Sequence, residues 1–95
     1  MRYVPPTPED LRRVKDELGR TGDQMADLFG LGGGHQWRKY TGGDAPREMS
    51  AHMLFFGAAR LVLDAAALQA VVDRVQAMGG TLQVNADGAV SGPDA

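Results

Sequence analysis

The sequence "TGDQMADLFGLGGGHQWRKYT", residues 21–41, contains the clearest structural pattern in the chain. It begins with a Thr-x-x-Gln capping box at Thr21, in which two side chains satisfy free backbone N–H groups of a first helical turn. Apolar residues then recur from Met25 to Phe29 at helical spacing, and Gly30 ends the pattern. The spacing predicts a helix of about nine residues followed by a glycine-rich turn.

A second short helix is expected after the glycines, at residues 34–41. Trp37 and Tyr40 are three residues apart and share one face, which is the geometry of side chains that pack inward. The remaining side chains are expected to point outward, and they are His35, Gln36, Arg38, Lys39 and Thr41. Two short helices with apolar inner faces and a polar outer face, joined by a turn, are typical of a helix-turn-helix.

Further helices are expected on both sides of this pair. One lies between the capping residue Thr7 and Gly19. Another, at about residues 51–63, is apolar nearly all round, which is typical of a central helix. The last, residues 64–78, carries an apolar stripe. The sequence therefore predicts an all-α fold, a compact bundle of four to five helices that forms one domain over residues 1–80.

Composition bounds the remaining possibilities. A chain of 95 residues suffices for one domain with one modest core, and residues 81–95 are expected to form a short tail, irregular or folded as a hairpin around an Ala-Asp-Gly turn. The chain has no cysteine, and His35 and His52 stand far apart without further ligands at helical spacing. We therefore expect neither a metal nor a cofactor.

The charge of the chain is unevenly distributed. The net charge of −2 argues against nucleic acid as a partner, because phosphate binding needs clustered Lys and Arg. However, residues 1–60 hold nine basic side chains against eight acidic ones, whereas residues 61–95 hold one basic side chain against four acidic ones. A small basic face is thus compatible with an acidic C-terminal third that lies away from the ligand.

The chain resembles the XRE or phage-repressor type of helix-turn-helix regulator over about residues 9–63. Members run leucine-glycine, a capping Ser or Thr, two polar residues, an apolar-alanine pair, an apolar residue, glycine and valine. The corresponding residues here are Leu18, Gly19, Thr21, Met25, Ala26, Leu28, Gly30 and Leu31. Trp37 and Tyr40 match the inward positions of the second helix if the turn holds one extra residue, and Gly33 and Gly34 stand where members usually carry polar side chains.

This resemblance implies a sequence-specific DNA-binding transcriptional regulator, in the style of a phage or mobile-element repressor. Its helix 34–41 would enter the major groove of a double-stranded operator, and the protein would bind as a homodimer. The residues expected to contact DNA are Thr21, Gly34, His35, Gln36, Arg38, Lys39, Thr41 and Arg47. The glycines before this helix either let backbone N–H groups bind a phosphate or form a loose turn without a ligand. The stripe of residues 64–78 either pairs two copies or packs back on its own chain.

The alternative is a helical protein-interaction module or an antitoxin-like partner with the same fold. The low net charge favours it, as does Gly22, which stands where the family often has a phosphate-binding glutamine.

The sequence contains no arrangement of nucleophile, base and acid and no cofactor motif, so we do not expect an enzyme. We expect a cytoplasmic protein without membrane contact, because no apolar run is long enough for a span and no leader pattern is present.

Overall fold

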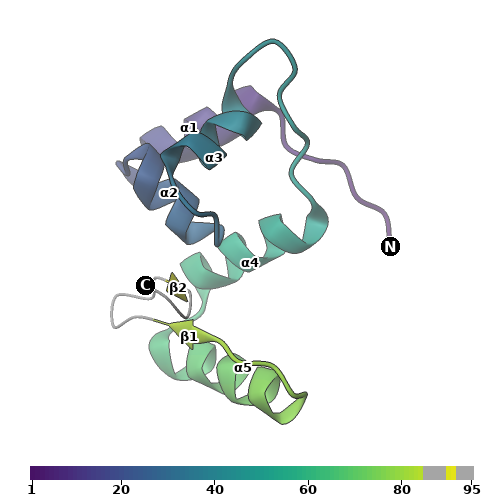
Figure 1. The fold of residues 1–95 in the computed structure, drawn as a ribbon, viewed down its shortest axis with the longest axis vertical. Helices are drawn as coiled ribbons and strands as arrows, with labels where there is room; N and C mark the ends of the chain where they lie inside the picture. The colour runs from purple at the N-terminus through teal and green to yellow at the C-terminus, as the bar shows by residue number, and fades with distance from the viewer. Residues whose placement is uncertain (85–89, 92–95) are drawn as a thin grey trace.

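The computed structural model describes residues 1–84 and 90–91, which form five helices and one pair of short strands (Figure 1). The helices are α1 (Pro8–Leu18), α2 (Gly22–Leu28), α3 (Gly34–Thr41), α4 (Ala51–Val62) and α5 (Ala65–Ala77). The strands β1 (Gln83–Val84) and β2 (Val90–Ser91) pair antiparallel, with Gln83 opposite Ser91. The predicted all-α helical bundle is confirmed. The predicted Ala-Asp-Gly turn at residues 86–88 lies outside the described residues.

The first two helices begin at capping boxes, as the sequence predicts. The backbone N–H of Thr7 donates to the Asp10 carboxylate at 3.0 Å, and the Asp10 N–H donates to the Thr7 hydroxyl at 3.0 Å. Thr21 and Gln24 form the same reciprocal pair at α2. Helix α2 is two residues shorter than the predicted nine, because the chain leaves the helix at Phe29 and turns at Gly30, whose φ is 73°.

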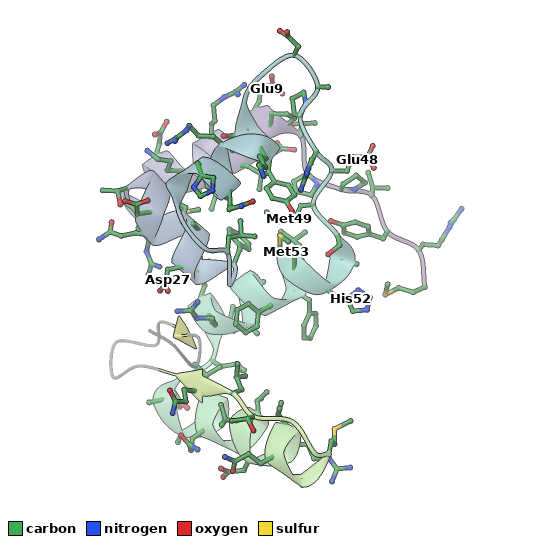
Figure 2. The ribbon with its side chains drawn as sticks, in the orientation of Figure 1. Glu9, Asp27, Glu48, Met49, His52 and Met53 are labelled. Atoms are coloured by element: carbon green, nitrogen blue, oxygen red, sulfur yellow. The ribbon has the colours of Figure 1, made fainter. Side chains whose placement is uncertain are left out.

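One hydrophobic core lies between α1, α2, α3 and the segment that leads into α4. Its buried members are Leu11, Met25, Ala26, Leu28, Phe29, Trp37, Tyr40 and Met49. The rings of Phe29 and Trp37 are stacked, with centroids 5.7 Å apart and an interplanar angle of 11°. Met49 belongs to this core, and Met53, on the first turn of α4, packs against it (Figure 2). The N-terminal arm is held here as well, because the Tyr3 hydroxyl donates to the Met49 carbonyl.

Helix α4 crosses the end of α2 and covers the core with one face only. Arg60 links the two helices: its side chain is 3% exposed, donates to the backbone carbonyls of Asp27 and Leu28, and lies 3.6 Å from the Asp27 carboxylate. On the other face of α4, Phe55 and Val62 are exposed. Helix α4 is central, as the sequence predicts, in that it lies between the other helices and α5 (Figure 1), but α5 leaves much of its apolar surface uncovered.

Helix α5 lies beyond α4, on the side away from α1 and α3 (Figure 1). Asp64 caps it by accepting from the Ala67 N–H at 2.8 Å, and Leu68 and Val72 are its buried residues. No helix in the described part of the chain is both long and apolar enough to cross a membrane.

Candidate nucleic-acid interface

Helices α2 and α3 pack against each other through apolar faces, as in a helix-turn-helix. The side chains of Met25, Ala26 and Phe29 meet the rings of the second helix in the shared core. Trp37 is 2% exposed and Tyr40 is 9% exposed. The prediction that both rings point inward is therefore confirmed, and the opposite side of α3 is the side that faces solvent.

The outer face of α3 carries positive charge. His35, Arg38 and Lys39 are exposed. Among residues 1–84 and 90–91, no carboxylate lies within ion-pair distance of Arg38 or Lys39. Both cations are thus available to a ligand. Gln36 is half-buried, and its Nε2 atom lies 3.2 Å from Nε2 of His35. It therefore exposes less of its side chain on the outer face than its charged neighbours do.

One further cation and the start of the following loop lie at the C-terminal end of α3. The backbone N–H of Arg47 donates to the Lys39 carbonyl at 2.7 Å, which holds the following loop against the helix. The guanidinium of Arg12, from α1, donates to the Thr41 carbonyl and forms a 3.0 Å ion pair with Glu9. Cations are favoured at this position because the last carbonyls of a helix carry partial negative charge.

Thr41 does not join the outer face, and the prediction that it points outward is wrong. The residue is 7% exposed. It follows Trp37 by four residues, so the helical geometry that turns the indole inward also turns Thr41 inward. Its side chain is therefore not available for DNA.

The N-terminus of α3 already holds an anion, the carboxylate of Asp23. Gly34 is buried, and its N–H donates to Oδ1 of Asp23 at 2.7 Å. Of the two alternatives for these glycines, a phosphate bound at the Gly34 N–H is disfavoured, because the Asp23 carboxylate already accepts from that donor. A Cβ at Gly34 would lie 2.7 Å from that same oxygen, which explains the glycine, whereas Gly32 faces open space.

Thr21 lies close to the start of α3. A Cβ added at Gly22, the next residue, would lie 3.7 Å from the Trp37 ring and 3.9 Å from the Cα of Gly34. Thr21 is exposed, and its hydroxyl accepts the Gln24 N–H, so its O–H hydrogen is available to donate to an acceptor such as a phosphate oxygen.

Sequence reasoning missed the roles of Asp23 and Arg12. The signal for Asp23 was the glycine at the predicted start of α3, because a helix without a capping side chain needs another acceptor for its free N–H groups. Arg12 had no comparable signal, since its contact joins residues 29 positions apart along the chain.

In comparisons with protein-family models, curated proteins and solved structures, none matches this chain. The function is therefore inferred from the geometry of α2 and α3.

Proposed function

We propose that the protein is a sequence-specific DNA-binding regulator, in the style of a phage or mobile-element repressor, that places α3 in the major groove of an operator and binds as a homodimer. The observation that supports this most directly is the pair of exposed cations, Arg38 and Lys39, on the side of α3 opposite the buried Trp37 and Tyr40. A helix of this width fits the major groove, where Arg and Lys bind guanine edges.

The residues divide into two sets by the contacts they are placed to make. We assign the base-edge contacts to Arg38, Lys39 and His35, because they are exposed on the outer face of α3. We assign the backbone contacts on either side to Arg47, whose N–H bonds to the Lys39 carbonyl, and to Thr21 at the start of α2. Because Gly34 and Thr41 are buried, fewer side chains read bases than the sequence suggests.

The test is a binding assay with a pool of random DNA duplexes, from which bound sequences are selected at low salt. Arg38→Ala and Lys39→Ala should each weaken binding to the selected duplex by more than about 1 kcal/mol, since each removes a base or phosphate contact. Arg74→Ala, an exposed cation on α5, is the matched control and should bind like the wild type. Circular dichroism checks that the variants are folded. If Arg38→Ala and Lys39→Ala bound the selected duplex as tightly as Arg74→Ala does, the proposal would be contradicted.

A protein-interaction module is the second candidate, favoured by the position of Asp23. Its negative charge lies at the N-terminus of α3, beside the proposed DNA surface, where it would repel a phosphate. Salt separates the two functions. DNA binding through several phosphates should fall steeply between about 50 and 200 mM salt, whereas an apolar protein interface should change little.

A further inference from the structure

The side of the molecule away from α3 carries a large exposed apolar surface. A groove of about 1000 Å³ runs between α4 and α5, and its walls are almost entirely apolar. On and beside it, Phe55 is 77% exposed, Val62 is 80% exposed and Val71 is 46% exposed. Monomeric proteins rarely leave so many large apolar side chains together in water, so this surface indicates an interface.

The order of side chains along α4 is self-complementary. Phe55, Ala58, Ala59 and Val62 follow one another at intervals of three, one and three residues, so they form a single stripe along the helix. The stripe has a large side chain at each end and two small ones in the middle. An antiparallel copy of the same stripe therefore brings Phe55 beside Val62 at both ends, while the alanines let the two helices approach closely.

We propose that a second copy of this chain covers the surface, with the two α4 helices antiparallel about a two-fold axis between Ala58 and Ala59. This deepens the proposed function, since it assigns the homodimer contact to α4 together with α5, but it depends only on the shape of the α4 stripe. The groove has the right size for this occupant. A rod about 10 Å wide and 1000 Å³ in volume is about two helical turns long, which is the length of the stretch from Phe55 to Val62.

The electrostatics of α4 also suit a second copy. The stripe itself is uncharged, and Arg60, the one Lys, Arg, Asp or Glu of α4, lies outside the stripe in the wall of the groove. Arg60 already has its guanidinium in the α2 contact, with 3% exposure, so pairing does not remove an exposed charge from water there. His52 is exposed at the start of the helix, one turn outside the stripe (Figure 2).

Sedimentation equilibrium of the full chain tests the proposal. The wild type should be a dimer, and Phe55→Glu and Val62→Glu should each raise the dimer dissociation constant at least about a hundredfold, because the two-fold axis places two unpaired carboxylates in an apolar interface. Met78→Glu is the matched control. Met78 is 76% exposed and stands at the end of α5, outside the stripe, so this variant should remain a dimer. Circular dichroism confirms that each variant is folded.

Disulfide trapping tests the orientation of the two α4 helices. Because the chain has no native cysteine, the introduced cysteine is the only one that can form a disulfide. Under mild oxidation Ala58→Cys should form a disulfide-linked dimer, since the two copies of residue 58 face each other beside the axis. His52→Cys should not, because antiparallel pairing separates the two copies of residue 52 by about 20 Å along the helices.

The outcomes separate this inference from the proposed function. A wild type that is monomeric at high concentration overturns the inference, even if the groove takes up a small apolar dye or another protein. Cross-linking through His52→Cys instead of Ala58→Cys overturns the antiparallel arrangement. If the wild type is a monomer that binds the selected duplex, the dimer proposal is wrong and the DNA-binding proposal stands. If it is a dimer with the predicted cross-link that binds no DNA, the DNA-binding proposal is wrong and the dimer proposal stands.

Discussion

Gly57 is the buried residue of α4. A Cβ added there would lie 2.2 Å from the ring of Phe29, far inside van der Waals contact. Phe29 cannot easily move away, because its ring is buried and stacks on Trp37. The contact between α4 and the α2–α3 pair therefore depends on the absence of a methyl group at residue 57.

Gly57→Ala should lower the free energy of unfolding by about 2 kcal/mol, even though alanine is the better helix former, because overpacking a buried contact outweighs the gain in helix propensity. Gly32→Ala adds the same methyl group where nothing lies within 4 Å, and it should change stability by less than about 0.5 kcal/mol. Urea denaturation of both variants measures the difference. Equal stability of the two would show that Phe29 does not restrict residue 57.

At the scale of the element, the start of α1 depends on a charged cap. The backbone N–H of Thr7, the guanidinium of Arg13 and the Thr7 hydroxyl together hold the pKa of Asp10 below its ordinary value of 3.8. A carboxylate with a lowered pKa stabilises the folded state when it is ionised. Its contribution is therefore present above the ordinary pKa and is lost as the pH falls through the lower, folded-state pKa.

Asp10→Asn should consequently make the protein less stable than the wild type at pH 6. In acid, the two proteins should have similar stability. The difference in urea midpoint between wild type and Asp10→Asn should shrink as the pH is lowered from 6 to 2, since the wild-type cap is then protonated. Asp16→Asn is the control from the same helix. It removes an equal charge from a side chain for which the described structure shows no cap or ion pair. A difference for Asp10→Asn that stays constant with pH would contradict the role of the charge.

The elements also show which parts of the structure the sequence could predict. The capping boxes and the inward Trp37 depend on residues within one or two helical turns, so the sequence predicted them. The cap that Asp23 supplies to Gly34 spans eleven residues across a turn, and its pairing depends on how two helices pack. The open face of α4 was beyond prediction for a related reason. A helix that is apolar all round does not indicate which side its neighbours cover, because the direction of α5 decides that.

For the whole molecule, the two proposed surfaces lie far enough apart to be used together. Helix α3 stands at one end of the long axis and α5 at the other, with α4 between them (Figure 1). The molecule extends 41 Å along that axis. Pairing through α4 would thus leave both α3 helices uncovered. Half-sites one DNA turn apart, about 34 Å, are within the dimensions of such a dimer.

Coupling between pairing and DNA binding is the prediction that joins the two proposals. Residue 62 lies outside the DNA surface, so the Val62→Glu variant should bind a duplex with a single half-site with the affinity of the wild type. On a duplex with two half-sites it should bind at least about tenfold more weakly, because two independent monomers lose the advantage of linked binding. Fluorescence anisotropy with both duplexes, at one salt concentration, measures the two affinities. Lys39→Ala is the informative comparison, since it removes a DNA contact from every half-site and should weaken binding to both duplexes. If Val62→Glu behaved in the same way as Lys39→Ala, the substitution would be acting on α3 itself and the α4 interface would have no part in DNA binding.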